Sequence, residues 1–273
     1  MDEFEVDKQI EFNIRAHDRI AKKYDAMHGE VFNVPEQTRL KQSLVTAVKK
    51  VTSGSDTLKA LDFGCGSGNL SKQLLDLNLD VTAADISGEF LSLVRSRYPT
   101  ERLSTFKLNG INLSGMDNSH YDFIAMYSVL HHIPDYLSAL KDLTHVCKPG
   151  GIIYIDHENN PAYWSNQPVY KEFKEKALKV DWKKYLSFSN YIHKVRSLYI
   201  PRYTNEGDIH VWPDDHIEWD KIEELFTENG FEVVISDDFL LYKKLYRAEI
   251  YDQYKDLCSD MRIMAFRKLL PNG

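Results

Sequence analysis

The segment Leu61–Leu70 constrains the fold of this chain more than any other. An apolar run from Thr57 to Phe63 predicts a strand, three glycines follow as Gly-x-Gly-x-Gly, and the spacing of Leu70, Leu74 and Leu75 predicts a helix. A glycine-rich strand-to-helix turn lets backbone lie close to a ligand. The helix that follows directs free N–H groups and the positive end of its dipole at that ligand. The segment therefore predicts a site for a nucleotide-like cofactor.

Apolar strands and amphipathic helices alternate along the chain around this turn. We expect strands at Leu58–Phe63, Val81–Ala84, Leu103–Leu108, Tyr121–Tyr127, Gly151–Asp156, Phe231–Ser236 and Met261–Phe266. We expect helices at Gly68–Leu77, Glu89–Tyr98, Asp135–Val146, Asp220–Asn229 and Leu245–Leu257. This alternation predicts an α/β fold with a doubly wound, Rossmann-like, seven-stranded and mostly parallel sheet that has helices on both faces.

Composition and charge narrow the class of protein. The chain has 273 residues, of which 43% are hydrophobic and 27% charged, as in ordinary soluble globular proteins. A formal charge of −7 disfavours nucleic acid as a partner. No apolar run reaches the ~18 residues of a membrane helix, and the acidic start, Met1–Asp7, does not resemble a signal peptide. We therefore expect neither a nucleic-acid nor a membrane partner.

The cysteines and histidines give no sign of a metal site. Cys65, Cys147 and Cys258 are scattered and form no Cys-x-x-Cys pair, so we expect neither disulfides nor zinc, and a reducing, cytoplasmic location. The adjacent pair His131 and His132 does not have the spacing of metal ligands.

The glycine-rich turn alone leaves two cofactor classes open. A dinucleotide-binding turn requires Gly-x-Gly-x-x-Gly, whereas Asn69 stands at the third glycine position and Gly68 comes one residue early. Asp85 ends the second expected strand, where a carboxylate can accept hydrogen bonds from both hydroxyls of a ribose. Asp85 therefore indicates a ribose without deciding between a nicotinamide dinucleotide and another nucleoside.

Together with its surroundings, the segment resembles the class I S-adenosylmethionine-dependent methyltransferases, over roughly Tyr24 to Asp156 and the closing strands. The glycine-rich turn, the strand end at Asp85, the fourth strand with the Ser128–Ile133 turn, and Lys148-Pro149-Gly150-Gly151 match that family's motifs in order and spacing. The resemblance implies S-adenosyl-L-methionine as cofactor and methyl transfer as activity.

The resemblance also implies a role for each matching residue. Asp62 is expected near the amino group of the methionine part, the amides of Gly64, Gly66 and Gly68 near its carboxylate and the sugar, and Asp85 and Ile86 at the ribose and adenine. The segment Asn109-Gly110-Ile111 is expected at the adenine, with Asn109 in place of the family's usual acidic residue. The remaining expected contacts are Tyr127 and Ser128, at the methionine part, and Tyr24, in an N-terminal lid.

We interpret the chain as four segments. Residues 1–52 are expected to form the helical lid, 53–158 the cofactor-binding core, 159–216 an inserted aromatic-rich cap that borders the acceptor pocket, and 217–273 the rest of the core sheet. Three of the four tryptophans lie in the cap segment. Because loops after strand carboxyl ends border the crevice of an open α/β sheet, we expect the acceptor there.

The acceptor is expected to be a small molecule. His131 is our candidate for a general base, since imidazole titrates near neutral pH and the turn after the fourth strand opens onto the site. We expect only one of His131 and His132 to face the site, and His157 and Glu158 are further candidates. An oxygen acceptor is favoured over nitrogen or carbon. A non-catalytic S-adenosylmethionine binder and a nicotinamide-dependent oxidoreductase remain as alternatives.

Overall fold

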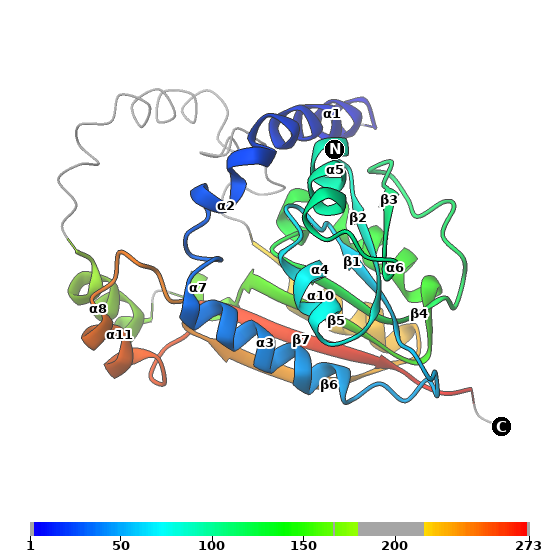
Figure 1. The fold of residues 1–273 in the computed structure, drawn as a ribbon. Helices are drawn as coiled ribbons and strands as arrows, with labels where there is room; N and C mark the ends of the chain where they lie inside the picture. Colours follow the sequence, from blue (N-terminus) through cyan, green and yellow to red (C-terminus); the bar gives the residue numbers. More distant parts are fainter. Residues whose placement is uncertain (1–2, 166, 180–215, 272–273) are drawn as a thin grey trace.

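A single seven-stranded sheet forms the centre of the molecule (Figure 1). The computed structural model describes residues 3–165, 167–179 and 216–271. The strands are β1 (Lys59–Phe63), β2 (Asp80–Asp85), β3 (Leu103–Lys107), β4 (Tyr121–Tyr127), β5 (Cys147–Asn159), β6 (Phe231–Phe239) and β7 (Met261–Lys268). They lie in the order β3-β2-β1-β4-β5-β7-β6. Strand β7 runs antiparallel to β5 and β6, whereas the other neighbouring strands in this order run parallel. The predicted fold class is confirmed.

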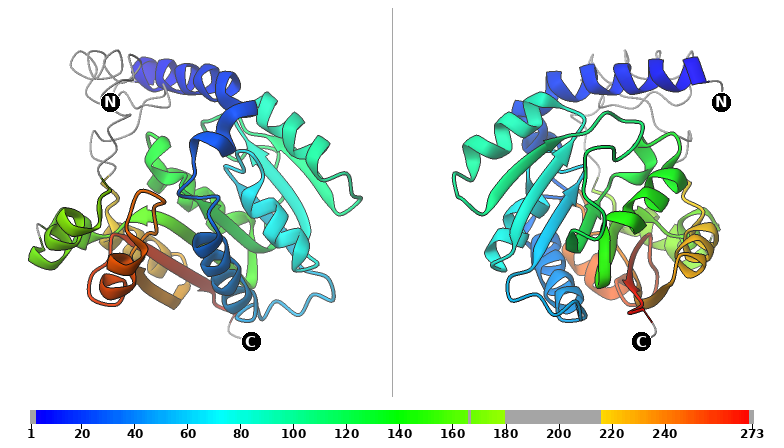
Figure 2. Two further views of the ribbon diagram at one scale, coloured as in Figure 1. Left: turned by 60° about the vertical axis from the view of Figure 1, so that its left-hand side comes forward. Right: turned by 90° about the vertical axis from the view of Figure 1, so that its right-hand side faces the viewer.

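Helices cover both faces of this sheet (Figures 1 and 2). The helical elements of the N-terminal half are α1 (Glu3–Ile20), the 3-10 turn η1 (Ala21–Lys23), α2 (Tyr24–Met27), α3 (Val34–Val48), α4 (Asn69–Asp76) and α5 (Gly88–Arg97). After β4 come the 3-10 turn η2 (Leu130–His132), α6 (Tyr136–Val146), α7 (Pro161–Trp164), α8 (Pro168–Ala177), α10 (Trp219–Glu228) and α11 (Ala248–Tyr254).

Alternation along the strands produces two apolar layers. On β1, Leu61 and Phe63 pack towards α6 and α10, whereas Ala60 packs towards α3 and α4. The same alternation on β4 and β5 makes both strands almost fully buried, as their continuous apolar sequences require. Helix α5 packs on the α3–α4 side through Leu91 and Val94.

Local sequence signals set where the helices begin. The side chains of Asn33, Ser87 and Asp135 each accept a hydrogen bond from a backbone N–H in the first turn of α3, α5 and α6. Helix α10 ends before Gly230, which has a φ of +77°, the left-handed conformation that favours glycine.

The edge of the sheet where the parallel strands begin is held by one buried carboxylate. Asp122 accepts hydrogen bonds from the hydroxyls of Ser53 and Ser55, each at 2.6 Å, and from the backbone N–H of Lys59 at 2.8 Å. It also pairs with Lys148 Nζ at 2.9 Å, and these hydrogen bonds hold the pKa of Asp122 below its usual value despite burial. This cluster fastens the segment before β1 to β4 and β5.

Two segments lie outside the main layers. Helices α8 and α11 pack together beside the sheet in Figure 1, around Phe173, Tyr246 and Tyr254. Helix α1 runs above the sheet and contacts α5 (Figure 2). Most of the expected cap, residues 180–215, lies outside the described residues.

Candidate functional site

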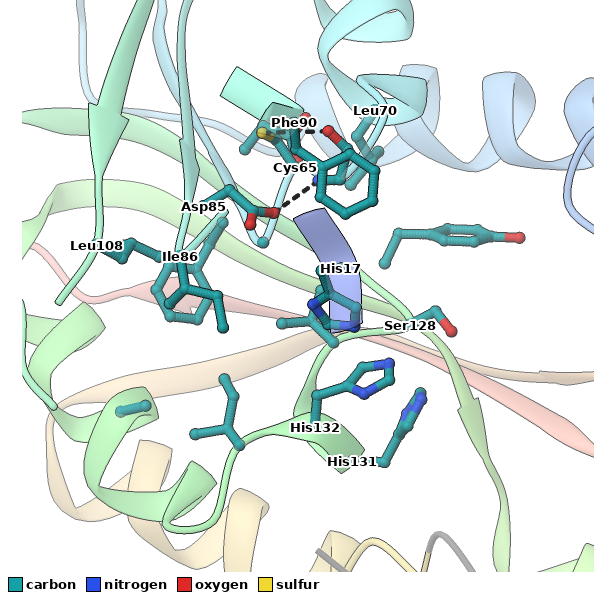
Figure 3. Close-up of a pocket in the computed structure, with 18 of the residues that line it drawn as sticks. His17, Cys65, Leu70, Asp85, Ile86, Phe90, Leu108, Ser128, His131 and His132 are labelled. Atoms are coloured by element: carbon teal, nitrogen blue, oxygen red, sulfur yellow. Dashed lines mark hydrogen bonds between the residues drawn. The ribbon is translucent and has the colours of Figure 1, made fainter. Parts of the chain in front are cut away.

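A cavity of about 520 Å³ opens where β1, β2, β4 and β5 end (Figure 3). These strands run in parallel, so their carboxyl ends meet at one edge of the sheet. The chain leaves β1 towards β2 on one side, while β4 lies on the other, and such a switch point is where open α/β sheets bind ligands. Asp85, Ile86 and Leu108 line one side of the cavity, and Ser128, His131 and His132 line another.

The glycine-rich turn after β1 presents bare backbone to this cavity. Gly66 has a φ of +49°, and a Cβ added there would meet no atom of the described residues within 4 Å. Its N–H donates to Asp85 Oδ2 at 2.9 Å, which ties the turn to the end of β2. Gly66 therefore leaves room for a ligand against the main chain.

Gly64 and Gly68 are required for packing. A Cβ at Gly64, which also lines the cavity, would lie 2.7 Å from the methyl groups of Val129. A Cβ at Gly68 would lie 2.9 Å from the ring of Tyr98 and 3.0 Å from Val94. Gly68 is not among the residues that line the cavity, and its missing side chain allows the start of α4 to pack closely on α5.

Three polar atoms beside the turn are buried without a hydrogen-bond partner among the described residues: Asp62 Oδ1, Ser67 Oγ and Asn69 Nδ2. All three residues line the cavity. Asp62 Oδ2 accepts from Ser71 Oγ at 2.6 Å, and burial raises the pKa of Asp62 to about 7. The Asp62 oxygen can accept a hydrogen bond from an ammonium group, and the Ser67 hydroxyl and Asn69 amide can donate hydrogen bonds to a carboxylate. The methionine part of S-adenosylmethionine carries both groups.

Asp85 is fixed in a position suited to a ribose. Its Oδ1 accepts from the Ser87 N–H at 2.7 Å and its Oδ2 from the Gly66 N–H, and burial raises its pKa. Each carboxylate oxygen has a second lone pair available for a sugar hydroxyl. Ser87 caps α5, which leaves Asp85 available to the cavity.

The adenine end differs from expectation at Asn109. Its Oδ1 accepts from the backbone N–H groups of Ile111 at 2.8 Å and Asn112 at 2.9 Å, and the residue does not line the cavity. Asn109 thus closes a local turn, a common role for asparagine, and its oxygen is already used. Gly110, Ile111 and Asn112 line the cavity, as does Ile86.

The carboxyl ends of β4 and β5 form the side of the cavity opposite to Asp85. Tyr127 and Ser128 line the cavity, as expected, and Ser128 has a φ of +59° while its N–H donates to Asp156 O at 3.0 Å. The Tyr127 ring stacks on His157, with centroids 4.5 Å apart. The Tyr127 hydroxyl donates to Glu36 Oε1 at 2.9 Å, which fixes the ring.

His131 is held by a buried carboxylate. Its Nδ1 lies 2.8 Å from Glu158 Oε2, while Glu158 Oε1 accepts from the N–H groups of Val129 and Leu130, each at 2.8 Å. A carboxylate that orients an imidazole and stabilises its protonated form is the usual support for a histidine base. This arrangement can accept a proton from a ligand in the cavity.

The expectation that only one of the adjacent histidines would face the site is wrong. His131 and His132 both line the cavity, and their ring centroids are 4.2 Å apart (Figure 3). The 3-10 turn η2 carries both side chains to one side, which a sequence pattern of strands and loops does not reveal.

The N-terminal segment adds residues that sequence reasoning missed. His17, Val31 and Phe32 line the cavity together with Tyr24 and His28, the two residues that resemble the lid of the methyltransferase family. The Tyr24 ring lies 5.3 Å from that of Phe90, and Asp25 pairs with Arg97 at 2.8 Å. The amphipathic spacing of residues 10–24 is the signal that could have pointed to His17.

Two features are absent from the part of the chain that the structure describes. Within it, no group of three or more His, Cys, Asp or Glu side chains could hold a metal ion. No helix in the same residues is long and apolar enough to cross a membrane.

Comparisons with known proteins agree with this geometry. Residues 61–153 match the family model of a methyltransferase domain. A demethylmenaquinone methyltransferase of Staphylococcus aureus (strain MRSA252) is 31% identical over 165 residues, which are 58% of this chain and 63% of that protein. One of Staphylococcus haemolyticus is 27% identical over 226 residues, 79% of this chain and 83% of that protein. The chain thus spans less than two thirds of the Staphylococcus aureus relative.

Solved structures show the same fold. An S-adenosylmethionine-dependent methyltransferase of Mesorhizobium loti has a TM-score of 0.55 at 15% identity, covering 83% of this chain and 96% of that one. Another from Methanosarcina mazei has a TM-score of 0.52 at 21% identity, covering 79% and 94%. Residues 61–153 thus carry a methyltransferase domain, and the chain has the fold of S-adenosylmethionine-dependent methyltransferases.

Proposed function

We propose that this chain transfers a methyl group from S-adenosylmethionine to a small molecule that carries a hydroxyl group. The observation that supports the proposal most strongly lies beside the glycine-rich turn, where Asp62, Ser67 and Asn69 have buried polar atoms with no hydrogen-bond partner in the described part of the chain. Their charges and hydrogen-bonding types suit the zwitterionic end of that cofactor, whereas a nicotinamide dinucleotide has no such group.

The bound cofactor supplies an activated methyl group, so the protein chiefly has to align an acceptor behind that carbon in a dry site. Asp62, Gly66 and Asp85 would hold the cofactor from β1 and β2. Tyr127 and Ser128, on β4, would border the methionine part. The base His131, oriented by Glu158, would take the proton of the acceptor hydroxyl.

The identity of the methylated atom follows from the acceptor. Once a hydroxyl has lost its proton, the oxygen itself is nucleophilic, and we favour it as the acceptor atom. In an aromatic hydroxyl compound the neighbouring ring carbon is nucleophilic too. The relatives named demethylmenaquinone methyltransferases favour a ring-bearing acceptor, so carbon methylation of such a ring is our second candidate.

The remaining segments have proposed roles as well. Residues 1–52 would act as a lid through Tyr24, and residues 159–216 as a cap beside the acceptor. The scattered cysteines suit a reducing, cytoplasmic compartment, and the net charge of −7 suits a small acceptor better than nucleic acid.

Two measurements test the proposal. Calorimetry should give a binding signal with S-adenosylmethionine and with S-adenosylhomocysteine, and none with NADH. Labelled cofactor should then pass its methyl group to at least one compound in a panel of hydroxylated aromatic molecules. A signal with NADH alone would overturn the cofactor assignment. Cofactor binding with no transfer to any panel member would favour a non-catalytic binder.

A further inference from the structure

Two consecutive side chains of β5 serve the same site, although neighbours on a strand normally point to opposite faces. Glu158 holds the loop that carries His131, and His157 lines the cavity. His157 has a φ of +61°, and the pairing of β5 with β7 shifts register between Ile155 and Glu158. A histidine in the left-handed conformation is strained, and such strain concentrates at functional sites.

The position of His157 in the sheet places it far from the nucleoside end. The strand ends follow one another as β2, β1, β4 and β5, with Asp85 on β2 and Gly66 after β1. His157 lies on β5, at the other end of this row. A ligand that meets His157 is therefore the second ligand of the site, beyond the methionine part of the first.

The surroundings of His157 suit a flat, uncharged partner. The ring is stacked on Tyr127 at an angle of 26°, and the residue is only 8% exposed. Its Nε2 is buried without a hydrogen-bond partner among the described residues. His131 and His132, on the turn after β4, also line the cavity and add two further aromatic rings on the β4 side of it.

The groups that act on His157 electrostatically favour its neutral form. Burial, followed by the positive charges of Arg39, His131 and Lys243, lowers the pKa of His157 well below its usual value. A neutral imidazole nitrogen can donate or accept one hydrogen bond, which suits a hydroxyl group better than a carboxylate.

We propose that His157 is an acceptor-binding residue that hydrogen-bonds a hydroxyl of a flat aromatic acceptor through Nε2, with the ring of that acceptor against the Tyr127–His157 stack. This inference rests on the proposed function, since it assigns the second ligand of the same cavity. His131 would then take the proton, and His157 would select and position the ring.

Binding of a stable probe tests the inference without requiring turnover. Naphthol and naphthalene differ only in a hydroxyl, and each can be titrated into protein saturated with S-adenosylhomocysteine. The variants His157→Asn and His157→Gly tolerate the left-handed backbone, so neither adds strain. His120→Asn, at the start of β4 and away from the cavity, is the matched control.

We expect His157→Gly to weaken naphthol binding about tenfold, the effect of one lost hydrogen bond, and to leave S-adenosylhomocysteine binding within about twofold. The affinity for naphthalene should be the same in the parent and in His157→Gly, and the affinity for naphthol should be the same in the parent and in His120→Asn. Equal naphthol affinity in the parent and His157→Gly, loss of S-adenosylhomocysteine affinity in step with naphthol, or no naphthol binding to the parent would each overturn the inference. Histidine-dependent naphthol binding without any methyl transfer would instead count against the proposed function alone.

Discussion

Asp62 shows how a single buried carboxylate can oppose stability and serve binding. Its side chain is fully buried, one oxygen is paired with Ser71, and no described residue pairs with the other. Burial raises its pKa to about 7, so the folded protein holds this proton more tightly than the unfolded chain. The contribution of Asp62 to stability therefore falls as the pH rises from 3.8, the ordinary pKa of an aspartate, to about 7.

The raised pKa of Asp62 leads to opposite expectations for the cofactor affinity and the stability of the variant Asp62→Asn. Its affinity for S-adenosylmethionine should fall about tenfold or more, because the ammonium loses its charged partner. At about pH 8 the variant should be more stable to urea than the parent, because a buried unpaired charge has been removed. In the parent, calorimetry should show tighter cofactor binding at about pH 8 than at about pH 6. A variant that loses both stability and affinity would contradict this account.

His131 is the residue at which chemistry and binding should separate. We expect His131→Gln to lower kcat by about 10²-fold, the usual effect of a lost general base, with cofactor affinity within about twofold of the parent. Labelled-methyl transfer and calorimetry measure the two quantities. If kcat stays unchanged, the proton leaves the acceptor by another route.

At the scale of elements, the β1–α4 turn uses its glycines for different purposes. Gly68 has a φ of +90° and faces Tyr98 and Val94, whereas Gly66 faces open space. We expect Gly68→Ala to lower the free energy of unfolding by about 2–4 kcal/mol through backbone strain and overpacking. Gly66→Ala should cost about 1–2 kcal/mol and weaken cofactor binding more than Gly68→Ala does.

Urea denaturation and calorimetry of the two glycine variants give this comparison directly. Because both substitutions add the same methyl group at positions two residues apart in one turn, each serves as the control for the other. A larger loss of cofactor affinity in Gly68→Ala would move the binding surface to the α4–α5 contact.

The elements could be predicted well from the sequence because apolar strands buried on both faces leave a continuous signal. The observed β4 has the predicted bounds, and β1 begins one residue after the predicted Leu58. Strand β5 begins earlier than predicted, at Cys147, because Cys147 pairs with Tyr121 of β4 before a register shift, after which the pairing resumes at Ile152.

The positions of site residues were less predictable where a side chain has several possible hydrogen-bond or packing partners. Asp62, Gly66 and Asp85 could be located because motif spacing fixes their place at strand ends. The turn at Asn109 depends on hydrogen bonds within its own loop, and the approach of His17 depends on the path of the N-terminal segment. Strand periodicity predicts strict alternation, so it could not reveal that both His157 and Glu158 serve the cavity.

Across the whole molecule, a buried ionic network joins the N-terminal segment to the sheet. Arg39, on α3, donates to both oxygens of Asp156 at 3.1 Å and to Glu36 Oε2 at 2.9 Å. Tyr154 donates to Asp156 as well, and the Arg39 guanidinium lies 3.9 Å from the centre of the Phe239 ring. The network holds the backbone immediately before His157.

Removal of the arginine should therefore be costly. We expect Arg39→Met to lower the free energy of unfolding by about 3–5 kcal/mol, because two buried carboxylates lose their cation. Lys41→Met, an exposed cation on the same helix, should change it by less than about 0.5 kcal/mol. Equilibrium urea unfolding measures both, and equal effects would contradict the role of the network.

The Asp122 cluster lies at the opposite edge of the sheet from the cavity, and its oxygens are satisfied by Ser53, Ser55, Lys59 and Lys148. The cluster that anchors the segment before β1 is thus separated from the cavity by the length of the strands. An engineer could alter acceptor choice at the carboxyl ends of the parallel strands, or attach a reporter near the Asp122 cluster at their amino ends, with little effect of one change on the other.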